Sequence, residues 1–181
     1  MNDKRSHRKF IWVYPIVAVV CIICIFCLYW GCWQPVTTVL IVRHAEKSSV
    51  GGADPELNPA GQQRAQTLAH VAGGADIAAI YATQFIRTQK TVEPLANYLG
   101  LSVIQYTAKD VAGLVDDIKS NHSGEIVVVA AHSNTVPQIV QELGGDPIDP
   151  ISESDYDNLF IVSLFRYRGP KVLHLKFGAP T

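Results

Sequence analysis

Three short apolar runs, each followed by a basic or helix-starting segment, constrain the fold of this chain more than any other feature. The first run covers residues 38–42 and stops at Arg43 and His44, and another covers 126–131 and stops at His132. Uninterrupted runs of β-branched and small apolar residues are typical of strands buried on both faces of a parallel α/β sheet. Ligands bind where such strands end in loops, so these runs predict a site at their carboxyl ends.

The remaining run, residues 80–83, leads into a further basic residue. A helix is expected after it, with Arg87 in the opening turn. A helix N-terminus presents unpaired N–H groups and a partial positive charge, so a guanidinium beside it makes an anion site. Arginine offers a planar fork for phosphate oxygens and histidine titrates near neutrality, so these strand-end side chains can hold and attack a phosphoryl group. The alternative for each of them is an ordinary surface ion pair.

The segments between the runs alternate between helical and extended patterns. Asn58 is expected to cap the first helix, and Ser133 or Asn134 the last. Strand and helix alternation followed by a hairpin over residues 158–177 predicts a three-layer α/β/α sandwich with a mostly parallel central sheet. Helices are expected over residues 58–72, 87–99, 111–120 and 135–143, and further strands over 76–83, 102–106, 125–131, 158–167 and 171–177.

Four motifs follow one another along the chain at residues 43–47 (RHAEK), 57–61 (LNPAG), 83–91 and 131–135 (AHSNT). Together they resemble the histidine phosphatase superfamily, also called phosphoglycerate mutase-like, in its branch of small phosphatases. The resemblance extends over about residues 36–177 and implies the fold of that family. It implies that His44 is the nucleophile that becomes phosphorylated. Arg43, Arg87 and His132 would surround the phosphoryl group as catalytic and substrate-binding residues, and Ser133 is a further substrate-binding candidate.

The sequence departs from the family pattern at the proton donor. Family members that cleave ordinary phosphate esters commonly use a Glu between the second Arg and the second His, and this chain has none between Glu93 and Glu125. The candidate donors are Asp110, Asp116 and Glu46. If all three are instead solvated carboxylates, the enzyme depends on leaving groups that depart without much protonation, or on N-phosphoryl bonds.

The N-terminal segment differs in character from the rest. Residues 10–33 contain no charged side chain and follow the basic tail 1–9. At about 1.5 Å per residue, a helix of this length crosses a hydrocarbon core of about 30 Å, so one transmembrane helix is expected before a domain at 36–181. The positive-inside rule then keeps the N-terminus in the cytoplasm and places the domain in the periplasm or outside the cell. A cleaved signal peptide and lipidation at Cys32 are the alternatives.

The amino-acid composition limits the kinds of ligand and partner that the domain can have. All four cysteines, Cys21, Cys24, Cys27 and Cys32, lie in the N-terminal segment, which excludes disulfides and a Cys-ligated zinc site from the domain. Beyond the basic tail lie 15 of the 16 acidic residues but only 11 of the 15 basic residues, a net charge of −4 that disfavours nucleic acid. The expected partners are a phosphorylated small molecule or phosphoprotein and a membrane, with no cofactor or metal. The oligomeric state is left open.

The predicted function is therefore that of a membrane-anchored, metal-independent phosphatase. It would hydrolyse a phosphomonoester or a phosphoramidate through a phosphohistidine intermediate on His44. Two alternatives are a catalytically silent module that binds a phosphorylated ligand, and an anchor or assembly subunit of an envelope complex. The presence of both His44 and His132 favours the enzyme.

Overall fold

The computed structural model describes residues 13–32 and 35–181 of the 181-residue chain. The chain divides into two compact units, one ending at Gln34 and the other covering Pro35–Thr181. The first unit contains helix α2 (Val13–Cys32), whose described side chains, at positions 14–15 and 17–27, are exposed.

The transmembrane helix expected over residues 10–33 is not supported. Across residues 13–32 and 35–181, no helix combines the length and hydropathy needed to cross a membrane. The uncharged run of the sequence also includes residues 10–12 and Trp33, which lie outside the described residues, as does the basic tail 1–9. A run of uncharged residues shows that a segment is apolar, but it does not show where a helix in that segment begins and ends. The orientation with the domain outside the cytoplasm stays a prediction.

The second unit contains every strand and helix that the sequence predicts for it, and the bounds agree to within one residue except at the hairpin, where the first strand ends earlier. The elements are β1 (Thr37–Arg43), α3 (Pro59–Ala72), β2 (Ile77–Thr83), α4 (Ile86–Leu99), β3 (Val103–Tyr106), α5 (Val111–Asn121), β4 (Ile126–Ala131), α6 (Thr135–Glu142), β5 (Asn158–Leu164) and β6 (Lys171–Lys176).

The helix caps agree with the sequence at α3 and differ at α6. The Asn58 side chain accepts a hydrogen bond of 2.9 Å from the backbone N–H of Gly61, as an N-cap does. At α6, Asn134 occupies the N-cap position as expected, but its side chain makes no capping hydrogen bond. The Ser133 hydroxyl donates instead to the carboxylate of Glu153.

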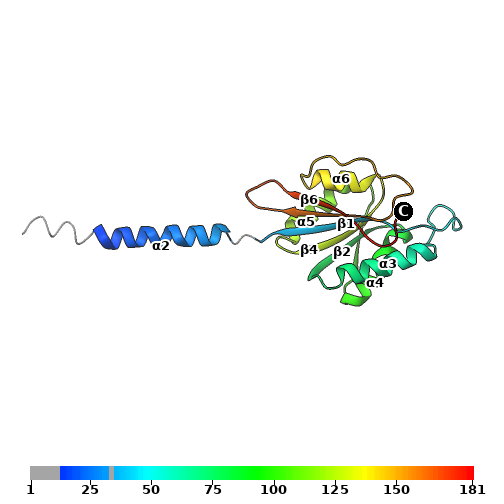
Figure 1. The fold of residues 1–181 in the computed structure, drawn as a ribbon, viewed down its shortest axis with the longest axis horizontal. Helices are drawn as coiled ribbons and strands as arrows, with labels where there is room; N and C mark the ends of the chain where they lie inside the picture. Colours follow the sequence, from blue (N-terminus) through cyan, green and yellow to red (C-terminus); the bar gives the residue numbers. More distant parts are fainter. Residues whose placement is uncertain (1–12, 33–34) are drawn as a thin grey trace, which may run out of the picture. The chain divides into compact units, whose positions relative to one another are not determined.

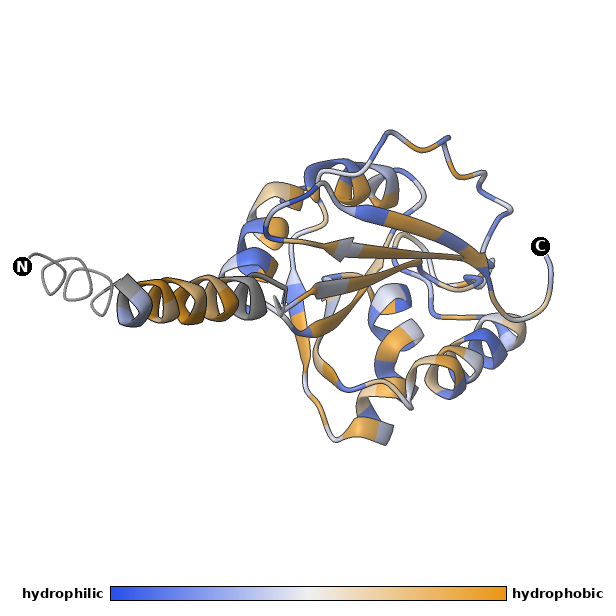
Figure 2. Ribbon diagram, turned by 60° about the vertical axis from the view of Figure 1, so that its left-hand side comes forward, coloured by the Kyte–Doolittle hydropathy of each residue, from blue (hydrophilic) through white to orange (hydrophobic). Residues whose placement is uncertain are grey.

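The strands form a six-stranded sheet in the order β3-β2-β4-β1-β5-β6 (Figure 1). The first four of these are parallel, while β5 runs antiparallel to β1 and β6 antiparallel to β5. This confirms the mostly parallel sheet with antiparallel pairing at one end. The apolar colouring of the strands in Figure 2 belongs mainly to the central strands β1, β2 and β4, which are almost wholly buried, whereas the edge strand β6 is mostly exposed.

The two hydrophobic cores lie on opposite faces of the sheet. Alternate residues of β1 point to different cores, which is the pattern of a strand buried on both faces. Val39 and Ile41 pack with α5 and α6, and Leu40 and Val42 pack with α3 and α4. The sandwich has three layers, and the carboxyl ends of its parallel strands meet at one edge.

Candidate active site

The sheet brings the predicted site residues together at this edge. In the parallel pairing of β1 with β4, Arg43 lies opposite Ala131, so the next residues, His44 and His132, are neighbours. Their ring centroids are 5.4 Å apart. β2 lies on the other side of β4 and leads into α4, which carries Arg87 in its first turn.

The antiparallel strands add segments that the motifs do not include. Because β5 runs antiparallel to β1, its first residue lies at the edge where β1 ends, and the loop at residues 143–157 arrives there. The Arg43 guanidinium lies over the Tyr156 ring, with its Cζ atom 4.2 Å from the ring centroid. The centroids of the Tyr156 and His44 rings are 6.1 Å apart. Sequence reasoning missed Tyr156 and Glu153, for which the only signal was an acidic, Pro- and Ser-rich loop.

A pocket of about 310 Å³ opens at this edge. Four predicted site residues line it, whereas the guanidinium of Arg43 is fully buried and does not. The basic lining suits an anionic ligand. The lining residues are His44, Lys47, Phe85, Arg87, Ala108, Lys109, His132, Ser133, Asn134, Thr135 and Glu153.

The imidazole of His44 is held in one tautomer. Its Nδ1 lies 2.8 Å from the backbone carbonyl oxygen of Ala45, and because a carbonyl only accepts, Nδ1 carries the proton. The Ala45 N–H in turn donates to the Thr91 hydroxyl at 2.9 Å. Burial is the main cause that lowers the pKa of His44 from 6.5 to about 3, and the positive charges of Arg43 and Arg87 add to it. The ring is neutral at physiological pH, and its Nε2 carries an unshared electron pair.

His132 is held through its other nitrogen. Nε2 lies 3.0 Å from the Thr83 hydroxyl oxygen, which is 2.7 Å from the Thr88 hydroxyl oxygen. The Thr88 hydroxyl donates to the Phe85 carbonyl, so Thr83 donates to Thr88 and His132 Nε2 donates to Thr83. Burial and the charge of Arg87 lower the pKa of His132 from 6.5 to about 4. The neutral ring therefore has Nδ1 unprotonated.

Arg43 is anchored by the loop before β5. Its Nη1 donates to the carbonyl oxygens of Ser152 (2.7 Å) and Asp155 (3.2 Å), and its Nη2 pairs with Glu153 at 2.8 Å. Its Nε is buried and has no hydrogen-bond partner among the described residues.

Arg87 and the start of α4 already hold an anionic side chain. The Asp54 carboxylate accepts from the Ile86 N–H at 3.1 Å and lies 3.3 Å from Arg87 Nη1. This is the anion position that the sequence predicts at this helix N-terminus. Arg87 also lies over the Phe85 ring at 4.4 Å, and its buried Nε, like that of Arg43, has no partner in the described part of the chain.

The three candidate proton donors lie elsewhere. Asp110 caps α5 by accepting from the Gly113 N–H at 3.0 Å, and Asp116 is exposed on the same helix. Glu46 is paired with Arg64. None of the three lines the pocket, whereas Glu153 does. Within residues 13–32 and 35–181, no three His, Cys, Asp or Glu side chains are grouped as metal ligands.

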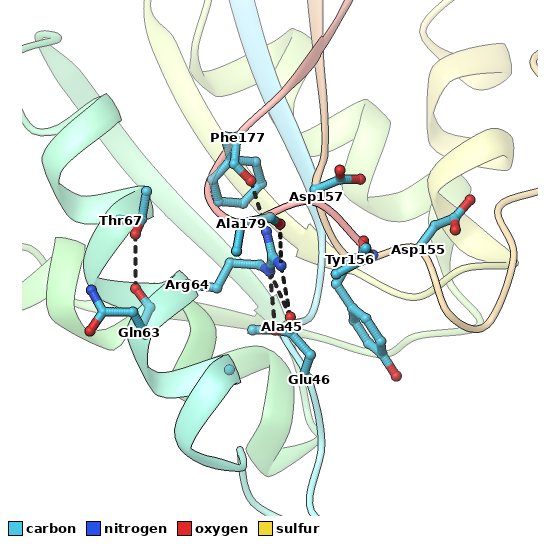
Figure 3. A network of polar contacts seen from close by, with 12 residues as sticks. Ala45, Glu46, Gln63, Arg64, Thr67, Asp155, Tyr156, Asp157, Phe177 and Ala179 are labelled. Atoms are coloured by element: carbon cyan, nitrogen blue, oxygen red, sulfur yellow. Dashed lines mark hydrogen bonds and ion pairs between the residues drawn. The ribbon is translucent and has the colours of Figure 1, made fainter.

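Arg64 connects the segment after β1 to the end of the chain. From α3 its guanidinium reaches the Glu46 carboxylate and the carbonyl oxygens of Phe177 (2.7 Å) and Ala179 (2.9 Å), as Figure 3 shows. The backbone N–H of Tyr156 donates to the Thr181 hydroxyl at 2.9 Å. The segment next to His44, the end of the chain and the aromatic ring under Arg43 are thus tied to one another.

Comparison with protein-family models shows that the model described as histidine phosphatase superfamily (branch 1) matches residues 39–110. This part contains the first three motifs but not His132. The sequence matches no curated protein.

Among solved structures the fold recurs in several phosphatases. A mycobacterial glucosyl-3-phosphoglycerate phosphatase with inorganic phosphate is 15% identical with a TM-score of 0.62, over 79% of this chain and 97% of its own. The protein histidine phosphatase SixA with tungstate is 19% identical with a TM-score of 0.61, over 77% and 96%. A phosphoserine phosphatase from Entamoeba histolytica with 3-phosphoglyceric acid is 16% identical with a TM-score of 0.56, over 79% and 97%. The chain therefore has a histidine-phosphatase-like fold.

Proposed function

We propose that this chain is a phosphatase of the histidine phosphatase superfamily that works through a phosphohistidine on Nε2 of His44. The observation that carries the proposal is the hydrogen bond from His44 Nδ1 to the Ala45 carbonyl. It puts the ring proton on Nδ1 and leaves the electron pair of Nε2 for attack. Burial keeps the ring neutral, so no proton has to leave before the attack.

In the first step His44 Nε2 forms a bond to phosphorus while the bond from phosphorus to the leaving group breaks, and the electron pair departs with that group. Negative charge on the three equatorial oxygens is met by Arg43 and Arg87, and by His132 once its Nδ1 has taken up a proton. The buried, unpaired Nε–H groups of Arg43 and Arg87 are two donors that a phosphoryl group would satisfy.

In the second step water attacks the phosphohistidine, the bond from phosphorus to Nε2 breaks and inorganic phosphate forms. His132 is fixed through Nε2 to Thr83, which leaves the unprotonated Nδ1 to accept the proton of the attacking water. All positive charge in this scheme comes from side chains.

The substrate class we propose is a phosphomonoester or a phosphoramidate, carried by a small molecule or a protein. The proteins of similar fold are named for glucosyl-3-phosphoglycerate, phosphoserine and protein phosphohistidine. Because Asp110, Asp116 and Glu46 lie outside the pocket lining, substrates whose leaving group needs little protonation are favoured.

The test is turnover of p-nitrophenyl phosphate by the full chain, combined with detection of the phosphoenzyme after a quench in denaturant at alkaline pH. We expect a phosphorylated protein that is labile in acid and stable in base, and its loss in His44→Ala together with a fall in turnover of about a thousandfold or more. Phosphate binding without turnover would support the silent module. A chain that neither binds phosphate nor turns over would favour the assembly subunit.

A further inference from the structure

The Glu153 carboxylate lies on two hydrogen-bond donors of the proposed phosphate site. One oxygen, Oε2, is 2.8 Å from Arg43 Nη2, and the other, Oε1, accepts a hydrogen bond from the Ser133 hydroxyl. These donors come from the end of β1 and the residue after His132. A carboxylate that bridges them uses its two oxygens as two phosphoryl oxygens would.

Glu153 and Arg43 differ in their access to the pocket. The Arg43 side chain is 0% exposed and does not line the pocket, whereas the Glu153 side chain is 75% exposed and does. A ligand in the pocket therefore has direct access to the Glu153 carboxylate, and it reaches the Arg43 guanidinium only if the groups that cover it move. Glu153 lies on a loop without helix or strand, residues 143–157, so the side chain can leave without breaking the sheet.

We propose that Glu153 is an internal competitor of the substrate: its carboxylate occupies Arg43 Nη2 and Ser133 in the ligand-free protein, and the incoming phosphoryl group displaces it. This inference rests on the phosphate site of the proposed function but does not require turnover. Glu153 would then lower the affinity for phosphate below the value that the arginines would give without it.

The charges around Glu153 keep it ionised as a competitor. Arg43, Lys47 and His44 face it from the end of β1 and the following loop, and it acts in turn on His132. The hydrogen bond from Ser133 and the charge of Arg43 lower the pKa of Glu153 below its ordinary value of 4.5. Both histidines are neutral near pH 7, so the arginine and the lysine are the cations that hold it.

The experiment measures the affinity of inorganic phosphate by calorimetry near neutral pH for the full chain and three variants. Glu153→Gln removes the charge and Glu153→Ala removes the carboxylate. Asp149→Asn removes a charge from an exposed position of the same loop and serves as the matched control. We expect both Glu153 variants to bind phosphate about two- to fivefold more tightly, because the carboxylate of the broken ion pair is largely exposed and screened by water, and we expect the control to match the wild type.

Unchanged or weaker phosphate binding in both Glu153 variants would overturn the proposal, as would equal tightening in Asp149→Asn, which would assign the effect to loop charge. Turnover is measured in parallel and separates the two proposals: tighter phosphate binding without any turnover supports the competitor and rejects the phosphatase. Unchanged phosphate affinity with a loss of turnover confined to alkyl phosphates would instead make Glu153 the proton donor.

Discussion

Arg64 and Glu46 form a nearly buried ion pair in which Arg64 Nε lies 3.1 and 3.0 Å from the two carboxylate oxygens and Nη2 lies 2.7 Å from Oε1. Their side chains are 3% and 13% exposed. The pair joins α3 to the residue that follows Ala45, whose carbonyl oxygen sets the tautomer of His44. A sequence candidate for proton transfer thus has a structural role.

Arg64→Met should destabilise the domain by about 3 kcal/mol or more, because it leaves the Glu46 carboxylate without its partner and frees two backbone carbonyl groups. The stability of Arg64→Lys should lie between those of the wild type and Arg64→Met, since an ammonium group cannot reproduce the planar fork of the guanidinium. Urea unfolding of the full chain measures this. The control is Lys90→Met, which removes an exposed pair with Glu93 and should cost about 0.2–1 kcal/mol. Equal losses for Arg64→Met and the control would contradict the assignment.

Gly61→Ala should destabilise the domain and lower activity. A Cβ at Gly61 would lie 2.3 Å from the carbonyl oxygen and 2.9 Å from the nitrogen of Glu46, and backbone atoms cannot move aside without shifting the segment next to His44. We expect a cost of about 1–3 kcal/mol, as for overpacking, together with reduced turnover. In the control, Gly74→Ala, the new Cβ meets nothing within 4 Å. Thermal unfolding and turnover that do not distinguish the two variants would rule out this tight approach.

Arg87→Ala should lower kcat/KM by about a hundred- to a thousandfold, the range for removing one donor to transition-state charge. Arg87→Lys should recover only part of this, because the planar fork is lost. Arg166→Ala, an exposed arginine in the β5–β6 turn region, is the control and should leave kcat/KM unchanged. An Arg87→Ala enzyme within threefold of wild type (about 0.6 kcal/mol) would exclude Arg87 from the phosphate site.

The two buried histidines should make the domain less stable in acid. Their pKa values are lowered from 6.5 to about 3 (His44) and about 4 (His132) in the folded domain. Between these values and pH 6.5 the unfolded chain therefore binds more protons than the folded domain does. Their stabilising effect is complete above pH 6.5 and is lost as the pH falls towards about 4 and 3. Denaturant unfolding over this window should show a shallower acid-side loss in His132→Asn than in wild type. The control is exposed His70→Asn, and identical slopes in all three proteins would refute the prediction.

Asp110→Ala should lower stability by about 1 kcal/mol because it removes the N-cap of α5. Asp110→Asn keeps a capping oxygen and should be nearly neutral. Neither should change how turnover depends on the pKa of the leaving group, since Asp110 lies outside the pocket lining. Comparison of aryl and alkyl phosphates checks this, and a loss restricted to alkyl phosphates would return Asp110 to the candidate donors.

Local sequence patterns were enough to predict the strands and helices and the residues that end them. Uninterrupted apolar runs define β1 and β4, and Asn58 with Pro59 begins α3, because such signals depend on residues within one turn or one strand. Parallel strands share a carboxyl edge, so the same patterns were enough to predict that His44 and His132 meet.

The other segments that reach that edge are set by how distant parts of the chain pack together. The pairing of β5 antiparallel to β1 brings Glu153 and Tyr156 onto Arg43 from more than a hundred residues away in sequence, and no local pattern encodes this register. Packing also determines the partners of polar side chains: Glu46 forms an ion pair with Arg64, and Asp110 caps the start of α5. A carboxylate's role depends on which donors the folded chain places within about 3 Å, and sequence spacing does not supply that distance.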